Sequence, residues 1–278
     1  DIINRGSDGG RNAVSFLKSV RNMLAGSASG RVNMSVKWDG APAIVAGRNP
    51  ENGKFFVGTK SVFNKTPKIN YTPGDIASNH SGPVADKLRV CLKELKRLGI
   101  TGIYQGDLLF TKGDTKIANI DGERMITFTP NTITYAVPVD SDIGKRIGNA
   151  KFGIVFHTNY EGNTLADATA NYDVNVSNLK RSNDVWFDDA FFKDVSGSVL
   201  MTKDETAQVK KDLADAMGAY KAVPNAVWEA MKSNDDFIKN FKIWINTNIR
   251  QGKLAGDPGE FLNGFIDWYK ERIEGEIA

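Results

Sequence analysis

Apolar residues recur at helical spacing in two stretches of the first hundred residues. In residues 11–25 they fall on one helical face, and Gly26 ends the pattern. Residues 84–98 repeat this spacing, and Gly99 follows as a C-terminal stop. The apolar positions are Val14, Leu17, Val20 and Leu24 in the first stretch, and Val84, Leu88, Cys91, Leu92, Leu95 and Leu98 in the second. We therefore predict two amphipathic helices, each with one buried face.

The middle of the chain has a different pattern, in which short β-branched and aromatic runs alternate with turn signals. Strands are predicted at 31–37, 43–47 and 54–59, and then in the runs GIYQGDLLF, MITFTP, TITYAVP, KFGIVFHTNY and DVWFDDAFF. The turn RNPENG joins the second and third strands, so these two form a β-hairpin. From about residue 31 to 195 we expect a mixed or antiparallel sheet.

The pattern changes again near residue 200, after which the β-type runs disappear. Two further helices are predicted, with apolar positions at Phe237, Phe241, Trp244, Ile245 and Ile249, and at Phe261, Phe265, Trp268, Tyr269 and Ile273. The sequence thus predicts an α+β protein in three parts. These are a helical lead-in at 1–30, a β-rich domain at 31–202 and an all-helical module at 203–278.

Composition narrows the class of protein. Of the 278 residues, 41% are hydrophobic and 25% charged, which is typical of a globular chain, and the net charge of +3 permits a polyanionic partner without requiring one. No apolar run reaches the roughly 20 residues of a membrane span. The single cysteine, Cys91, excludes an internal disulfide and is predicted to be a core residue, which fits a cytoplasmic protein. Two histidines without ligand partners at metal spacing make no zinc site, and His80 is read as surface.

The candidate chemistry begins in the stretch SVKWDGAPAIVAGRN. It places Lys37 at the end of a predicted strand, two residues before Asp39 and a turn at Gly40. One interpretation is a hairpin with a charged corner, and the other is a lysine that acts as a nucleophile. Further residues follow in order, in or beside predicted strands, and favour the second interpretation: Thr59, Lys60 and Ser61 at a strand end, Asp107 in IYQGDLLF, Gly153 in FGIVF, and Lys180 and Arg181 just before another strand.

This ordered set resembles the covalent nucleotidyltransferase superfamily, which contains ATP-dependent DNA ligases, RNA ligases and mRNA capping enzymes. The resemblance covers about residues 31 to 182. Its motifs are a Lys-x-Asp-Gly, a Ser/Thr–Arg/Lys pair, an aromatic–Gly–acid strand, a Glu-Gly-hydrophobic-Val strand and a final lysine. They match, in that order, Lys37, Asp39 and Gly40; Thr59 and Lys60; Tyr104, Gly106 and Asp107; Gly153, Ile154, Val155 and Phe156; and Lys180.

The resemblance implies a nucleotidyltransferase domain, of the ATP-grasp-like ligase type, built from mixed or antiparallel sheets with flanking helices. It also implies that Lys37 is the catalytic residue, that ATP is the donor of AMP and that Mg²⁺ is held by Asp107. The implied nucleotide-binding residues are Val36, Asp39, Gly40, Lys60, Tyr104, Asp107, Val155 and Lys180. Tyr104 or Tyr135 would stack on adenine.

Two departures from the family pattern concern charged groups. Pro42 stands where the family usually has an Arg, and Phe152 stands where the fourth motif has a Glu that helps to hold a metal. Glu161 is the nearest possible substitute for that acid. We predict that the site works with fewer protein metal ligands, because Mg²⁺ often binds through one or two carboxylates together with waters and substrate phosphates.

A lysine amine with an ordinary pKa near 10.4 must lose its proton before it can attack, and burial or neighbouring cations lower that pKa. The predicted function is an ATP-dependent polynucleotide ligase that joins a 5′-phosphate to a 3′-hydroxyl through a lysyl-AMP. The expected partners are DNA and/or RNA ends. We expect a monomer, encoded by a phage and located in the cytoplasm of the host. Its all-helical module resembles that of some phage RNA-repair ligases. Two alternatives remain: a capping guanylyltransferase, and a non-catalytic nucleic-acid-binding protein on a ligase scaffold.

Overall fold

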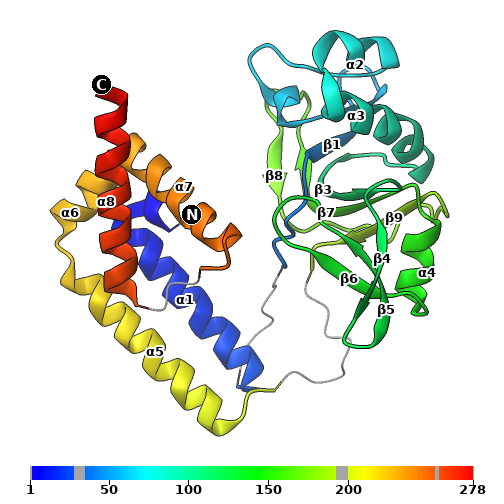
Figure 1. Cartoon of the computed structure of the whole chain (residues 1–278). Coiled ribbons are helices and arrows are strands. Elements are labelled where there is room, and N and C mark those ends of the chain that lie inside the picture. Colours follow the sequence, from blue (N-terminus) through cyan, green and yellow to red (C-terminus); the bar gives the residue numbers. More distant parts are fainter. Residues whose placement is uncertain (1, 28–34, 192–199, 254–256, 278) are drawn as a thin grey trace. The chain divides into compact units, whose positions relative to one another are not determined.

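The computed structural model describes residues 2–27, 35–191, 200–253 and 257–277 (Figure 1). Contacts divide the chain into two units. One contains Asp1–Asn33 together with Asp194–Ala278, and the other contains Met34–Lys193. We call them the helical unit and the α+β unit and describe each by itself. No helix in the described ranges is long and apolar enough to cross a membrane.

Two sheets form the centre of the α+β unit. The larger has the order β2-β1-β3-β7-β8, with β9 also paired to β7, and every pairing is antiparallel except β7 with β9. The smaller has the order β4-β5-β6. The strands are β1 (Ala43–Arg48), β2 (Phe55–Gly58), β3 (Ile103–Thr111), β4 (Lys116–Ile120), β5 (Glu123–Phe128), β6 (Tyr135–Pro138), β7 (Phe152–Glu161), β8 (Thr169–Asn171) and β9 (Val185–Asp189). The α+β class and the predicted hairpin of β1 and β2 are confirmed.

Helices cover the larger sheet on both of its faces. They are η2 (Lys60–Phe63), α2 (Pro73–Asn79), α3 (Gly82–Leu95), η3 (Lys96–Leu98) and α4 (Asp142–Asn149). On one face, Leu88 and Cys91 of α3 pack with Ile44 and Phe156 of the sheet, as the apolar spacing of α3 predicts. On the other face, Ile147 of α4 packs with a separate core cluster. Cys91 is fully buried, and this burial raises the pKa of its thiol to about 12.

The segment before β1 differs from its prediction as a strand at 31–37. Residues 31–34 lie outside the described residues, and residues 36–40 have no regular secondary structure. Ser35 forms an isolated bridge with Phe191, and the amide of Val36 donates to the carbonyl oxygen of Ala190 at 2.7 Å. Lys37 is therefore in an irregular segment that is fixed to the sheet by single contacts, and its side chain is exposed rather than buried.

The helical unit joins the N-terminal helix to the C-terminal helices. It consists of η1 (Ile3–Arg5), α1 (Gly6–Leu24), α5 (Lys203–Ala222), α6 (Asn225–Lys232), α7 (Asp235–Arg250) and α8 (Pro258–Ile277). Tyr220 of α5 lies over Gly10 of α1, whose amide donates to the tyrosine oxygen at 3.0 Å, and the tyrosine hydroxyl donates to the carbonyl oxygen of Gly6. The lead-in at 1–30 thus groups with the predicted module 203–278. The sequence-based division misses this, because α1 approaches α5 through glycines and not through an apolar stripe.

Aromatic rings pack between α7 and α8, as their helical spacing predicts. Phe265 of α8 is 2% exposed, and its ring centroid lies 5.5 Å from that of Phe237 and 5.0 Å from that of Phe241. Trp244 contacts Trp268 with centroids 5.6 Å apart. These contacts form the apolar centre of this part of the unit.

Candidate active site

Four of the residues predicted for the nucleotide site line one pocket of about 320 Å³ in the α+β unit, namely Val36, Lys37, Lys60 and Asp107. They come from three separate parts of the chain. Gln105, His157 and Tyr172 line the same pocket and were not predicted. A pocket of this size, lined by two lysines and one carboxylate, is suited to a small anionic ligand.

The sheet explains how these side chains come to face one another. Asp107 of β3 pairs with Ala43 at the start of β1, and both lie on the face opposite α3. Lys60 begins η2, directly after β2, where Thr59 caps the turn by accepting from the amide of Ser61 at 3.3 Å. Lys37 reaches the same face from the irregular segment before β1. The order of the motifs in sequence is thus converted into proximity by three adjacent strands.

His157 stands beside Asp107 in this pocket. Asp107 pairs with Val155 of β7, and the register then shifts between Gly106 and Gln105, so His157 has no partner in β3 and lies at an irregularity of β7 close to Asp107. Its Nε2 lies 3.6 Å from Oδ1 of Asp107, and its Nδ1 lies 2.7 Å from Oγ1 of Thr158. The two side chains are 29% and 17% exposed. The sequence of KFGIVFHTNY alone does not predict this position, because it depends on the register shift between β3 and β7.

Asp39 has a structural role and does not line the pocket. Its carboxylate accepts hydrogen bonds from the amides of Thr132 at 2.6 Å and Ile133 at 2.8 Å, and from the Asn131 side chain at 2.9 Å. Partial burial tends to raise the pKa of Asp39. The hydrogen bonds from the Ile133 and Thr132 amides and from Asn131, together with the charge of Lys37, outweigh it and leave this pKa lowered. Asp39 therefore anchors the segment that carries Lys37 to the β5–β6 connection.

Gly40 is required for a close approach to Asp107. A Cβ at Gly40 would lie 2.4 Å from the Cβ of Asp107 and 2.9 Å from the carbonyl oxygen of Leu108. The next residue, Ala41, donates its amide to that same oxygen at 2.9 Å. The Lys-x-Asp-Gly stretch thus supplies one pocket side chain, one anchor and one point of contact with β3.

Five of the predicted nucleotide-binding residues do not line the pocket: Asp39 and Gly40, described above, and Tyr104, Val155 and Lys180. Tyr104 is three residues from Asp107 and faces α3, where its hydroxyl donates to the carbonyl oxygen of Asn175 at 3.3 Å. Val155 is fully buried in the core cluster beside α4. Lys180 is exposed, lies over Gly99 and donates its amide to the carbonyl oxygen of Leu98 at 2.9 Å. None of these three side chains lines the pocket: Tyr104 is on the opposite face of β3, Val155 is enclosed in the core, and the course of the chain takes Lys180 elsewhere.

Tyr135, the other aromatic suggested for adenine, is also committed to packing. Its ring lies 5.1 Å from that of Trp38 and 5.5 Å from that of Phe128, and its hydroxyl accepts from the amide of Asp39 at 2.8 Å. Partial burial raises the pKa of the Tyr135 hydroxyl. Among the aromatic residues, Trp38 and Tyr172 line the pocket instead.

Neither Phe152, which stands in place of the fourth-motif glutamate, nor Glu161, its possible substitute, lines the Lys37 pocket. Phe152 is fully buried on the α3 face, and Glu161 is exposed at the far end of β7. Asp107 is the one carboxylate that lines the pocket among the described residues, and these contain no group of three or more His, Cys, Asp or Glu that could hold a metal ion. One carboxylate fits a Mg²⁺ that takes its other ligands from waters and substrate phosphates.

The fold and the pocket define a mixed α+β protein with a lysine-containing, anion-suited site on a largely antiparallel sheet. The chain belongs to DUF6267, a family of unknown function whose model matches residues 1–278. A search of curated proteins and a search of solved structures each found no match. The nucleotidyltransferase fold and activity therefore remain a prediction from sequence motifs and site geometry.

Proposed function

We propose that the protein is an ATP-dependent polynucleotide ligase in which Lys37 carries AMP. The observation that supports this most directly is that Lys37, Lys60 and Asp107, which lie far apart in the sequence, line a single pocket. The order of the motifs along the sequence and the proximity of their residues in the pocket are two independent observations, because a set of short motifs need not fold into one site. A charged hairpin corner would leave Lys37 apart from the other motif residues.

In the proposed first step, the neutral Nζ of Lys37 attacks the α-phosphorus of ATP. A nitrogen–phosphorus bond forms, the bond from phosphorus to the bridging oxygen breaks, and pyrophosphate leaves. The proton from Nζ passes to His157, whose side-chain type accepts protons near neutral pH. The presence of His157 in the same pocket as Lys37 supports this role. In the second step the adenylyl group passes to a 5′-phosphate, and a 3′-hydroxyl then displaces AMP.

The remaining pocket residues fit the charge and shape of a nucleotide. Lys60 supplies positive charge for the phosphate oxygens. A Mg²⁺ held by Asp107 and the substrate phosphates would neutralise further negative charge. Tyr172, which is 73% exposed and lines the pocket, is the aromatic side chain that we now propose for stacking on the base, in place of Tyr104.

The described residues after 200 bear on the kind of ligase. Capping guanylyltransferases, and most DNA ligases, normally carry an oligonucleotide-binding β-barrel after the nucleotidyltransferase domain. In the described residues from 200 onward, all regular structure is helical. This agrees with the helical module of some phage ligases, although architecture is only an analogy for chemistry.

The proposal is tested by labelling the protein with ATP that carries radioactive phosphorus at the α-position, in Mg²⁺, followed by a denaturing gel. Label is expected on the wild type and on the control Lys112→Ala, an exposed lysine of the same unit outside the pocket. Lys37→Ala and the charge-conserving Lys37→Arg should carry no label. Label retained by either Lys37 variant refutes the assignment of the nucleophile.

Two further results separate the alternatives. Label from GTP but not from ATP would identify a guanylyltransferase. A folded wild type that takes no label from either nucleotide would favour the non-catalytic nucleic-acid-binding protein. A nicked duplex with a 5′-phosphate, offered with DNA or RNA strands, then tests joining and identifies the preferred polymer.

A further inference from the structure

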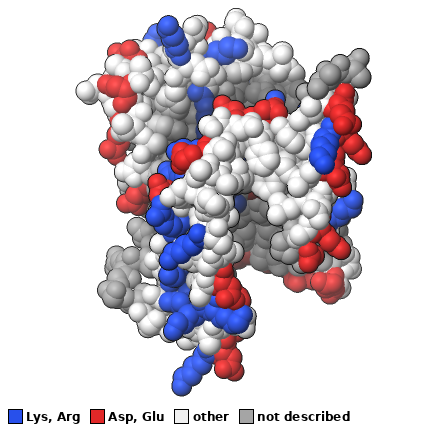
Figure 2. Space-filling model, turned by 90° about the vertical axis from the view of Figure 1, so that its left-hand side faces the viewer, with Lys and Arg blue, Asp and Glu red and all other residues white. Residues whose placement is uncertain are grey.

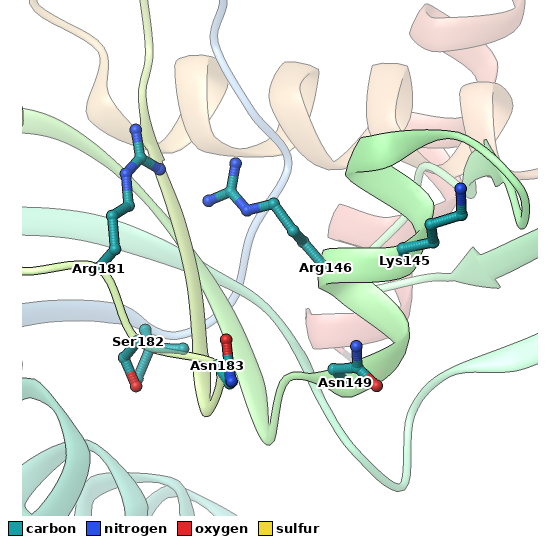
Figure 3. A pocket seen from close by; sticks show the side chains of 7 residues that line it. Lys145, Arg146, Asn149, Arg181, Ser182 and Asn183 are labelled. Carbon is teal, nitrogen blue, oxygen red and sulfur yellow. The ribbon is translucent and has the colours of Figure 1, made fainter.

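A second cavity in the α+β unit, of about 330 Å³, is lined by positively charged side chains from two elements (Figure 3). Lys145 and Arg146 come from α4, and Arg181 comes from the segment before β9. The remaining polar groups of the lining are amides and a hydroxyl, from Asn149, Ser182 and Asn183. The lining in the described residues contains no carboxylate.

Arg146 and Arg181 line the same cavity, and the described lining contains no acidic residue that could pair with either of them. In Figure 3 the guanidinium of Arg146 extends from α4 toward the side of the cavity where Arg181 rises. Neither arginine, nor Lys145, forms an ion pair within the described parts of the chain. Arg181 is held over the ring of Phe187, with its Cζ 5.1 Å from the ring centroid. Like charges gathered in this way favour an anion between them.

A neighbouring group of charges shows the contrast. Lys151 lies 3.0 Å from Asp184, and Arg97 lies 3.0 Å from the buried Glu94 and 3.4 Å from Asp184. There the chain supplies its own carboxylates. Both signs of charge also mix over the face of the molecule shown in Figure 2. The cavity of Lys145, Arg146 and Arg181 is therefore distinguished by its missing counter-charge, and not merely by its lysine and arginine content.

We propose that this cavity binds backbone phosphates of a polynucleotide. Guanidinium groups bind phosphate oxygens with paired hydrogen bonds, and amide and hydroxyl donors of the same lining can complete the contacts. The choice of a polynucleotide over a free nucleotide rests on the proposed ligase function. The inference that the ligand carries phosphate rests on the cations of the cavity and on the absence of a carboxylate from its described lining.

The position of the cavity along β9 supports a polymer. Val185, the first residue of β9, lines this cavity, and Ala190, just after its last residue, lines the Lys37 pocket. Five residues of strand span roughly 17 Å. This corresponds to about five nucleotide steps at the 3.4 Å rise of a duplex strand. A strand whose end lies at Lys37 can thus reach the cavity with a phosphate several nucleotides away.

This site also changes the interpretation of a sequence motif. The Lys180–Arg181 pair was assigned to the nucleotide through Lys180, but Lys180 lies over Gly99 while Arg181 lines the cavity. Of the two basic residues, Arg181 therefore contributes to this second cavity, and neither contributes to the Lys37 pocket that the motif order suggests.

The test measures binding of a fluorescent 20-nucleotide DNA, as single strand and as duplex, to the full chain over a range of salt concentrations. The variants are Arg146→Gln, Arg181→Gln and the double variant. Each lost phosphate contact should reduce the slope of log affinity against log salt by about 0.7 for a single strand and about 0.9 for a duplex. The reduction in this slope should therefore be about twice as large for the double variant as for either single variant, whether the protein binds the single strand or the duplex. Arg124→Gln, an exposed arginine of the same unit outside both pockets, is the matched control and should keep the wild-type slope.

Folding is checked by thermal unfolding of each variant. Arg146→Lys and Arg181→Lys keep the charge, so they should bind more tightly than the Gln variants and report on the site if those unfold. Competition with inorganic phosphate and with ATP identifies the source of the phosphate. Wild-type-like DNA binding by the folded double variant, no DNA binding by the wild type at low salt, or a loss confined to free phosphate or ATP would each overturn the proposal.

Labelling of Lys37 with ATP in the same variants separates this proposal from the ligase function. The double variant should be labelled within twofold of the wild type, since the cavity is distinct from the Lys37 pocket. If the wild type takes no label yet its DNA binding still depends on both arginines, the ligase function fails and the phosphate site stands. If label is lost with the arginines while DNA binding is retained, the cavity serves the nucleotide and the present proposal fails.

Discussion

The two units of this protein are held together in different ways. In the α+β unit, a sheet with helices on both faces buries residues such as Ile44, Leu88 and Phe156 completely. In the described part of the helical unit, the buried apolar side chains are only Val14, Leu213, Ile238 and Phe265. Most of its other aromatic side chains are partly exposed and make ring contacts with one another. The comparison indicates that the α+β unit, which contains the Lys37 pocket, is deeply packed, whereas the helical unit is less deeply packed and depends on a few residues.

The largest effect is expected for Phe265→Ala, which removes the most buried ring of the helical unit. Its ring contacts Phe237, Phe241 and Tyr269, so truncation leaves a cavity and should lower the free energy of unfolding of this unit by about 3–5 kcal/mol. Chemical denaturation followed by circular dichroism should show loss of helix ahead of the β signal. Phe16→Ala, at a residue that is 51% exposed in α1, is the control and should change little.

Labelling of Lys37 sharpens the same experiment. If the two units unfold independently, Phe265→Ala should retain adduct formation at denaturant concentrations where the helical signal is lost. One transition that moves for both units together would show instead that they unfold as a single cooperative structure.

The next effect concerns the close contact of Gly40 with β3. In Gly40→Ala the new methyl group would meet Asp107 Cβ at 2.4 Å and a backbone oxygen at 2.9 Å, so β3 or the Lys37 segment must move. We expect a loss of about 3 kcal/mol in the α+β unit, the upper end of typical overpacking costs. Gly113→Ala is the matched control, since a Cβ there meets nothing within 4 Å. If Gly40→Ala and Gly113→Ala are equally stable, the Lys37 segment or β3 can move to accommodate the methyl group without lowering the free energy of unfolding.

Asp107→Asn tests whether this carboxylate serves the reaction. It should slow adduct formation about 10²-fold, equivalent to about 2.7 kcal/mol, and raise the Mg²⁺ concentration needed. Glu161→Gln, the same change at the exposed end of β7, should leave the rate and the Mg²⁺ dependence unchanged. The reverse outcome, with Glu161→Gln dependent on Mg²⁺ and Asp107→Asn unaffected, would place the metal on the other acid.

The sequence predicted those features of the fold that follow from local periodicity. The spacing of Leu88, Cys91 and Leu95 predicted α3 and its buried face, and RNPENG predicted the β1–β2 hairpin. Features that depend on contacts between distant residues were not predictable. The approach of Gly10 to Tyr220 is one case, because glycine carries no periodic signal of its own.

The site divides in the same way. Motif order correctly predicted that Lys37, Lys60 and Asp107 lie together, because the segment before β1, the turn after β2 and the middle of β3, where Asp107 pairs with the first residue of β1, meet at one pocket. It failed for Tyr104, which is an odd number of residues from Asp107 and therefore faces α3. It missed His157, whose relation to Asp107 depends on the register of β3 with β7. Register is set by pairing across the sheet and is not written in either strand alone.

The smallest effect tests Asp39 as an anchor and depends on pH. Asp39→Ala removes three hydrogen bonds to the β5–β6 connection and should lower the free energy of unfolding of the α+β unit by about 1–2 kcal/mol near pH 7. The folded-state pKa of Asp39 is lowered from its ordinary value of 3.8, so the ionised carboxylate is the form that stabilises the fold. Its contribution is complete above that value and is lost as the pH falls through the lower folded-state pKa.

Urea denaturation of the wild type and Asp39→Ala at a series of pH values from 7 to about 3 measures this dependence. The difference in free energy of unfolding should stay constant down to about pH 4 and then shrink. Asp173→Ala, at an exposed acid whose side chain makes no hydrogen bond to the described residues, should differ little from the wild type throughout. A difference for Asp39→Ala that grows as the pH falls would mean that the protonated carboxyl stabilises the fold, contrary to its hydrogen bonds with backbone amides.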